Sequence, residues 1–300
     1  MEQTLAPSEV MVVDNAPKDD ITKRMVENEF PTVRYVQELT PGLSRARNRS
    51  LRESRYKIIA FIDDDAVADP DWVVAIQAVF DENPTIAVCT GKVRALSLET
   101  AGQLLFEANG GFERGNSRIR LPRDIQKRLS GLPAPLIAWS ISVGTGCSLA
   151  VRREKIIEIG GFDEMLGMGA AIPGSEDLDI IWRTLKAGAE VVYEPGVQAA
   201  HEHRRELAAA VYQILEYNRV LIAWLTKVVA MEHGPEKFWA LMFLLWRLMK
   251  PGVRLGRRVL GQDPLPSGIL LRLWWNGWRG LQAFSAAQQP TLPQASGKKE

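Results

Sequence analysis

An apolar run that ends abruptly in three carboxylates places the strongest constraint on how this chain can fold. Residues 57–62 read Lys-Ile-Ile-Ala-Phe-Ile and are followed directly by Asp63, Asp64 and Asp65. Such a run is typical of a strand that is buried on both faces, where a carboxylate would be costly. We therefore expect the carboxylates at the carboxyl end of the strand, where open α/β sheets place their ligands.

Acidic turns of this kind can hold a hard divalent cation, and such a cation can hold a diphosphate. Solvated acidic turns are equally common, so the triplet alone does not decide between the two. The surrounding pattern favours the first reading, because strands and helices alternate along the first part of the chain. We expect strands at 10–13, 33–36, 57–62 and 87–89 and helices at 19–27, 44–55 and 70–80. This alternation predicts an α/β fold with a mainly parallel sheet flanked by helices.

A second acidic group begins a later helix. Gly174 and Ser175 precede Glu176, Asp177 and Asp179, and an apolar-periodic run follows. The helix dipole favours acids at this position by about 0.3–1 kcal/mol each, which explains one acid more easily than three. The alternative is that one carboxylate acts as a general base.

Two further motifs could contact phosphate or metal. His201 and His203 are two of the three histidines in the chain and flank Glu202, so they could ligate a metal, contact a phosphate or lie in a polar surface loop. Residues 41–48 read Pro-Gly-Leu-Ser-Arg-Ala-Arg-Asn and open a predicted helix, whose backbone N–H groups and arginines suit phosphate. Between these motifs, residues 97–140 contain several glycines and prolines and are expected to form a long irregular excursion over a pocket.

Taken together and in this order, the motifs resemble family 2 glycosyltransferases of the GT-A (Rossmann-like) fold over roughly residues 8–230. The resemblance is carried by Val-Val-Asp-Asn at 12–15, Pro-Gly-Leu-Ser-Arg-Ala-Arg-Asn at 41–48, Phe-Ile-Asp-Asp-Asp at 61–65, Gly-Phe-Asp at 161–163, Ser-Glu-Asp-Leu-Asp at 175–179 and His201. It implies an enzyme that transfers a hexose from a nucleotide-sugar to a hydroxyl acceptor.

The resemblance also assigns roles to individual residues. It implies that Asp14 reads the uracil of a UDP-sugar. The implied nucleotide-sugar-binding residues are Asp14, Asn15, Gly42, Arg45, Asn48, Asp63 and Asp64. The implied ligands of Mg²⁺ or Mn²⁺ are Asp65, Asp63 and His201. Asp177 matches the catalytic base of inverting members, with Glu176 beside it as support or competitor.

The resemblance is incomplete at the N-terminus. Family members carry a strand and a helix ahead of the segment that corresponds to residues 8–15, and only seven residues precede Ser8 here. We therefore expect two unpaired strand edges, each exposing N–H and C=O groups. A truncated or non-catalytic binding protein is the alternative to an active enzyme. A nucleotidyltransferase is disfavoured, because Asp14-Asn15-Ala16-Pro17 is not a glycine-rich basic loop.

The C-terminal third differs in composition from the rest. From Arg204 onward the net charge is +8, whereas residues 1–203 carry −7. We expect a catalytic domain at 1–210, a helical Trp/Arg-rich extension at 211–286 and a disordered tail at 287–300. Trp with Lys/Arg on apolar helices predicts contact with a membrane interface, although packing on the catalytic domain or on a second subunit would produce the same pattern. The apolar runs 220–231 and 238–249 are shorter than the roughly 20 residues of a spanning helix.

Location and partners follow from the remaining composition. Cys89 and Cys147 form no disulfide or zinc spacing. The first residues lack the layout of a signal peptide, which predicts a cytoplasmic protein, peripheral at the inner face of the plasma membrane if the extension meets lipid. The net charge of +1 gives no reason to expect a nucleic-acid partner.

Overall fold

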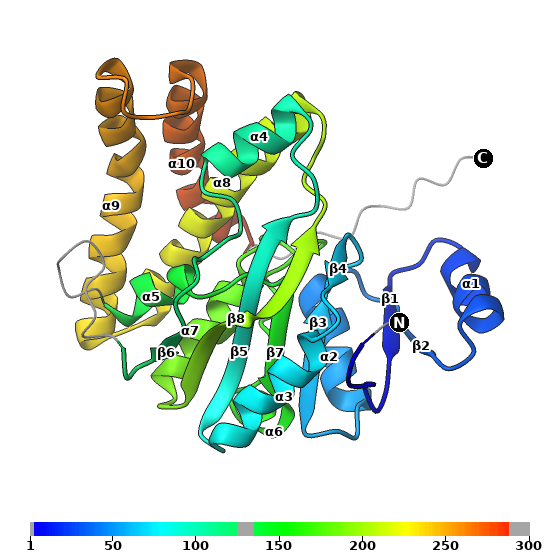
Figure 1. The fold of residues 1–300 in the computed structure, drawn as a ribbon. Helices are drawn as coiled ribbons and strands as arrows, with labels where there is room; N and C mark the ends of the chain where they lie inside the picture. Colours follow the sequence, from blue (N-terminus) through cyan, green and yellow to red (C-terminus); the bar gives the residue numbers. More distant parts are fainter. Residues whose placement is uncertain (1–2, 125–134, 288–300) are drawn as a thin grey trace, which may run out of the picture.

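The computed structural model describes residues 3–124 and 135–287 and has two sheets (Figure 1). The smaller sheet pairs β1 (Met11–Asn15) with β2 (Arg34–Glu38) in parallel. The larger sheet has the strand order β3-β7-β5-β8-β4, and β6 also pairs with β8. Its strands are β3 (Ile58–Ile62), β4 (Ala66–Ala68), β5 (Ile86–Ala95), β6 (Ile119–Leu121), β7 (Ser148–Arg152) and β8 (Glu190–His201).

The larger sheet mixes strand directions. β5 and β8 are parallel neighbours, while β7 lies antiparallel between β3 and β5, so that β3, β5 and β8 all run the same way. β4 and β6 run antiparallel to β8. The acidic turn consequently follows the end of β3, and His201 lies at the end of β8. β4 begins directly after the turn and runs antiparallel to β8.

Helices cover both faces of the larger sheet, as expected for an α/β fold. The helices of the described residues are α1 (Ile21–Glu29), α2 (Leu43–Glu53), α3 (Trp72–Glu82), α4 (Ala101–Ala108), α5 (Leu136–Ser142), α6 (Arg153–Glu158), α7 (Glu176–Lys186), α8 (Leu207–Met231), α9 (Gly234–Val259) and α10 (Ser267–Ala287). α3 packs on the face that carries Cys89 and Val192. Leu51 of α2 and residues of α5, α6 and α7 pack on the face that carries Val88 and Tyr193. The core therefore lies on both faces of β5, β7 and β8, between these strands and the helices that cover them.

One expectation from the sequence is wrong: β3 is not buried on both faces. Ile58, Ile59 and Phe61 are half-buried, while Ala60 is exposed and Ile62 is 39% exposed. The reason is its position at the edge of the larger sheet, since β7 is its sole strand partner among the described residues. β1 likewise pairs only with β2 within the described part of the chain. Each of these strands thus has one edge without a strand partner, as the sequence predicts.

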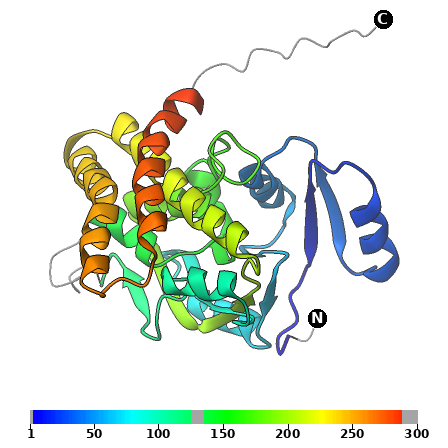
Figure 2. The same cartoon turned by 90° about the horizontal axis from the view of Figure 1, so that it is seen from above.

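The C-terminal helices form one packed unit with the sheet domain. α8 begins at Leu207, so the predicted boundary at 210/211 lies inside a helix. Val220–Val228 of α8 join a cluster that also contains Ile137, Leu166 and Trp182 from the preceding domain. α9 and α10 pack on α8 at the side of the molecule opposite α1 (Figures 1 and 2). None of the helices in the described residues is long and apolar enough to cross a membrane.

The region expected to be irregular contains regular structure. α4 begins with a capping box in which Thr100 and Gln103 bond to each other's backbone, and β6 pairs with β8 further along. Residues 125–134 of this region lie outside the described residues. So does the predicted disordered tail, apart from Ala287 at the end of α10.

Candidate active site at the β3–β4 turn and the start of α7

The three aspartates occupy the turn between β3 and β4. The backbone N–H of Ala66 donates to the carbonyl oxygen of Asp63 over 3.1 Å and closes the turn. Asp63 and Asp65 are half-buried, while Asp64 between them is exposed. The turn therefore directs two of its three carboxylates toward the interior of the site.

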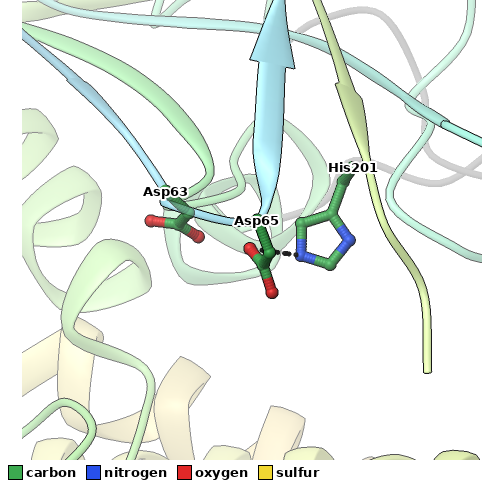
Figure 3. A group of neighbouring side chains, drawn as sticks. All are labelled: Asp63, Asp65 and His201. Atoms are coloured by element: carbon green, nitrogen blue, oxygen red, sulfur yellow. Dashed lines mark ion pairs between the residues drawn. The ribbon is translucent and has the colours of Figure 1, made fainter. Parts of the chain in front are cut away.

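His201 joins this pair because β4 is paired with the end of β8. Ala66 lies opposite His201 in the β4–β8 ladder, and Nε2 of His201 lies 3.2 Å from Oδ1 of Asp65. One ligand atom from each of Asp63, Asp65 and His201 can be chosen so that all lie within 4.8 Å of one another (Figure 3). Burial raises the pKa of Asp63 and lowers that of His201. Two carboxylates and an imidazole with a free lone pair form a donor set that fits Mn²⁺ or Mg²⁺.

The second acidic group starts α7 after two residues with positive φ, Gly174 at 150° and Ser175 at 64°. Its three acids have different partners. Asp177 accepts hydrogen bonds from the backbone N–H of Gly146 over 2.7 Å and of Leu178 over 2.8 Å. Asp177 is half-buried, so its carboxylate combines fixed orientation with access from the site.

Asp179 faces the opposite way and ties α7 to α8. Its carboxylate accepts hydrogen bonds from Nε1 of Trp224 over 3.0 Å, from Nζ of Lys227 over 3.2 Å and from Nε of Arg183 over 2.7 Å. Trp224 is fully buried, so it cannot belong to an exposed tryptophan surface. The third acid of the motif is therefore structural.

Arg47 connects the two acidic groups. Its guanidinium donates to Glu176 over 3.0 Å and to the carbonyl oxygen of Gly146 over 3.2 Å, and it lies 3.7 Å from a carboxylate oxygen of Asp63. The rings of Phe61 and Phe162 lie 5.6 and 5.5 Å from its guanidinium carbon. This buried cation fixes the start of α7 against the acidic turn.

Glu176 has a raised pKa. Burial, together with the charge of Asp177, raises the pKa of Glu176 to about 7, although Arg47 acts in the opposite direction. A carboxyl with this pKa exchanges its proton near neutrality, which is a property shared by many general acids and bases. Its burial against Arg47, however, separates it from an acceptor.

The predicted nucleotide residues on β1 and before α2 hold the local backbone together. Asp14 accepts a hydrogen bond from the hydroxyl of Tyr35 over 2.8 Å. Asn15 donates to the carbonyl oxygen of Thr40 over 2.9 Å and accepts from the N–H of Gly42 over 2.8 Å. Gly42 has a φ of 140°, which allows the chain to turn into α2 there.

Arg45 and Asn48 project from α2 toward the segment that follows α6. Arg45 pairs with Glu164 over 2.6 Å. The buried amide of Asn48 bonds both the N–H and the carbonyl oxygen of Phe162 over 2.8 Å. These contacts place both residues at the base of the site, and their predicted contact with the donor stays a prediction.

Sequence reasoning missed two sets of contacts. It treated Arg47 as one of several phosphate-binding residues, whereas this side chain bonds Glu176, which is 129 residues away. It also did not assign a partner to His203, which bonds Glu107 of α4 over 2.7 Å. Glu107 is one of four acids in residues 97–140, so no sequence signal singles it out, and only the fold brings it to His203.

Comparisons with known proteins identify the family and the fold. The family described as "Glycosyl transferase family 2" matches residues 1–160. A relative named "Pre-mycofactocin glycosyltransferase" from Mycobacterium tuberculosis is 27% identical over 222 residues, covering 72% of this chain and 42% of its own length. A "Glucosyl-dolichyl phosphate glucuronosyltransferase" from Haloferax volcanii is 26% identical over 227 residues, covering 71% of this chain and 66% of its own. The chain thus spans less than two thirds of either relative.

Two solved structures share the fold. The mannosyltransferase PcManGT from Pyrobaculum calidifontis, in complex with GDP-Man and Mn²⁺, superposes with a TM-score of 0.54 at 17% identity and covers 95% of this chain and 78% of that one. GalNAc-T7 with UDP, GalNAc and Mn²⁺ superposes with a TM-score of 0.50 at 14% identity and covers 86% of this chain and 52% of that one. The fold is therefore that of GT-A glycosyltransferases. With the family match extending over more than half of its residues, the chain belongs to glycosyl transferase family 2.

Proposed function

We propose that this protein transfers a hexose from a UDP-sugar to a hydroxyl acceptor with inversion at the anomeric carbon. The observation that carries the proposal is the link between its two acidic groups. Asp63, Asp65 and His201 gather their ligand atoms within 4.8 Å, and Arg47 joins Asp63 to Glu176 beside Asp177. A donor diphosphate at the first group would face an acceptor at the second.

The donor side of the site would use Asp63, Asp65 and His201 to hold Mn²⁺ or Mg²⁺. When bound, this cation supplies the positive charge that a leaving diphosphate requires. Asp14 would accept from the uracil N–H. Asn15, Gly42, Arg45, Asn48 and Asp64 would line the nucleotide and sugar. The PcManGT and GalNAc-T7 structures, which hold GDP-Man and UDP respectively with Mn²⁺, support a nucleotide donor of this class.

The acceptor side would use Asp177 as the general base. Its carboxylate takes the proton of the acceptor hydroxyl while the oxygen attacks the anomeric carbon and the bond to the diphosphate breaks. Glu176 would support this group through Arg47. One displacement with a single base inverts the anomeric centre, whereas retention would require a second nucleophile.

We further propose a lipid-linked acceptor at a membrane surface. α9 and α10 expose aromatic side chains on the faces directed away from α8, which are Phe238, Trp239, Trp246, Trp274, Trp275 and Trp278. Arg257 and Arg258 are exposed near the end of α9 and would meet anionic head groups, whereas Arg254 is held by Asp263. The Haloferax volcanii relative is named for a dolichyl phosphate substrate. This arrangement supports a peripheral protein at the inner face of the plasma membrane.

The proposal is tested by titrating UDP and GDP into the protein with Mn²⁺ and then with EDTA, followed by incubation with UDP-sugars. We expect UDP binding that EDTA removes, and release of UDP with an inverted product by NMR. A folded protein that binds neither nucleotide would support the non-catalytic alternative instead. Flotation with anionic vesicles, but not with neutral ones, would support the membrane contact.

A further inference from the structure

A chain of polar contacts leads from the acidic turn to the surface of α4. Nε2 of His201 lies 3.2 Å from Asp65, Nδ1 of His201 lies 3.1 Å from Nδ1 of His203, and Nε2 of His203 lies 2.7 Å from Oε1 of Glu107. Figure 3 shows that one ring nitrogen of His201 is directed at Asp65 and the other points away. The second nitrogen is the one that meets His203. Glu107 is therefore connected to the turn through both imidazoles.

The partners determine where the ring protons lie. An ionised carboxylate only accepts hydrogen bonds, so Nε2 of His203 carries a proton and donates it to Glu107. In a neutral imidazole the other nitrogen is then an acceptor, so Nδ1 of His203 accepts from Nδ1–H of His201. This leaves Nε2 of His201 with a free lone pair beside Asp65. A lone pair at this nitrogen is what a metal ligand requires.

The surroundings hold both rings in this arrangement. His201 and His203 are both buried, so neighbouring side chains confine each ring. The ring of Phe112 lies 5.0 Å from that of His201, and the ring of Phe106 lies 4.7 Å from that of His203, centroid to centroid. These aromatic rings restrict the orientation of the imidazole planes.

α4 is placed closely enough to deliver Glu107. Thr100 at its start donates to the carbonyl oxygen of Arg205 over 2.7 Å, and Gln103 donates to Glu202 over 3.1 Å. A Cβ at Gly102 would lie 2.6 Å from the carbonyl oxygen of Arg205, so glycine is needed for this approach. The helix is thus fixed against the segment that carries His203.

We propose that Glu107 and His203 are positioning residues that set the tautomer and orientation of His201 as a metal ligand. The inference rests on the proposed function, since it concerns the same metal site. Removing the outer partner of a ligating histidine typically weakens metal affinity 10–100-fold. We expect a loss of this size when Glu107 can no longer accept the proton of His203.

The test compares Mn²⁺ affinity in the presence of UDP for the unchanged protein, Glu107→Ala, Glu107→Gln and the control Glu99→Ala. Ala removes the acceptor, whereas Gln keeps an oxygen that can accept from His203. Glu99 is an exposed carboxylate just before α4 that pairs with Arg205, so its loss should leave the affinity unchanged. The nitrogen coupling of bound Mn²⁺, measured by electron spin-echo spectroscopy, reports directly on imidazole ligation.

We expect Glu107→Ala to bind Mn²⁺ 10–100-fold more weakly with a reduced imidazole coupling, and Glu107→Gln to recover most of both. Because Glu107 is partly exposed, the Ala variant should fold, which its thermal melting verifies. Equal affinity and coupling in all variants would overturn the inference while leaving the proposed function intact. Absence of Mn²⁺ binding by the unchanged protein would overturn both.

Discussion

The two acidic groups of the site contain the same kinds of side chain but differ in exposure. The Asp63 and Asp65 side chains are 35% and 37% exposed, whereas those of Glu176 and Asp179 are 8% and 3% exposed. Among the described residues, this half-buried pair contacts His201 and the guanidinium of Arg47. The buried acids are matched by cations and an indole within hydrogen-bond distance.

This difference separates carboxylates that can take a ligand from carboxylates that hold the fold. A buried charge must be paired, because an unpaired one costs several kcal/mol. Glu176 and Asp179 have such partners, so their carboxylate oxygens are not available to a ligand. Asp63 and Asp65 leave coordination sites open, and Asp177 lies between the two cases, held by backbone N–H groups yet accessible. Substitutions at the accessible carboxylates should therefore lower ligand affinity or turnover, whereas loss of a partner of the buried acids should lower the unfolding free energy.

The largest loss should follow Asp65→Ala. Removing one of three ligand side chains should abolish the Mn²⁺-dependent part of UDP binding, with an affinity decrease of more than about 100-fold expected for a direct ligand, beyond the 10–100-fold typical of its outer partners. Calorimetric titration with UDP, with and without EDTA, measures it. Asp64→Ala removes the exposed neighbour and should retain the dependence on metal. Unchanged affinity in Asp65→Ala would show that the acidic turn is not the metal site.

The next largest effect should be on turnover. Asp177→Asn keeps the shape of the side chain and removes its basicity, so transfer should fall by roughly 10²–10⁴-fold while UDP affinity changes little. Release of UDP under single-turnover conditions measures the rate, and titration measures the affinity. Retained turnover would assign the base to Glu176 and would contradict the view that burial removes that residue from chemistry.

The order of motifs predicted the fold well because each motif sits where a strand ends or a helix begins. Asp63–Asp65 and His201 come together because β4, which follows the acidic turn, pairs with the end of β8. The strand pattern of the sequence did not predict β4. Burial was predicted less well. The apolar composition of β3 suggests a central strand. Its side chains are more exposed than this predicts, because β3 lies at the edge of the larger sheet, next to β7.

Long-range pairing was not predictable from sequence spacing. Glu176, Asp177 and Asp179 appear equivalent in a four-residue stretch, yet a helix directs consecutive positions about 100° apart. One acid thereby meets Arg47, another meets the backbone of Gly146, and the third meets Trp224 on α8. Trp224 lies in the Trp/Arg-rich extension yet is fully buried, and the sequence does not show which face of α8 is covered.

A third substitution tests the buried ion pair between Arg47 and Glu176. Arg47→Met keeps the length of the side chain but leaves Glu176 buried without its cation, which should cost about 3–5 kcal/mol of unfolding free energy. Urea denaturation at pH 7.5 measures the loss. Arg45→Met on the same helix breaks a half-exposed pair with Glu164 and should cost less than about 1 kcal/mol. Equal losses of unfolding free energy in the two variants would mean that burial does not make the ion pair of Arg47 more important for stability than that of Arg45.

The smallest effect concerns the proton of Glu176. Its pKa rises from the ordinary 4.5 to about 7 on folding, mainly through burial and then through the charge of Asp177. The folded protein therefore binds this proton more tightly than the unfolded chain, so its contribution to stability is complete below pH 4.5 and is lost as the pH rises through 7. The full shift corresponds to at most about 3 kcal/mol.

Glu176→Gln should remove this pH dependence and no other, because His201, Asp63 and the remaining groups titrate in both proteins. The unfolding free energy of the unchanged protein minus that of the variant should fall between pH 4.5 and pH 7 and then level off. Urea denaturation in steps of pH measures this difference. If it rises instead, the ion pair with Arg47 outweighs burial, and Glu176 is an ordinary ionised partner of that arginine. A fall would establish that Glu176 retains its proton near neutrality in the folded protein and is not an ordinary ionised partner of Arg47.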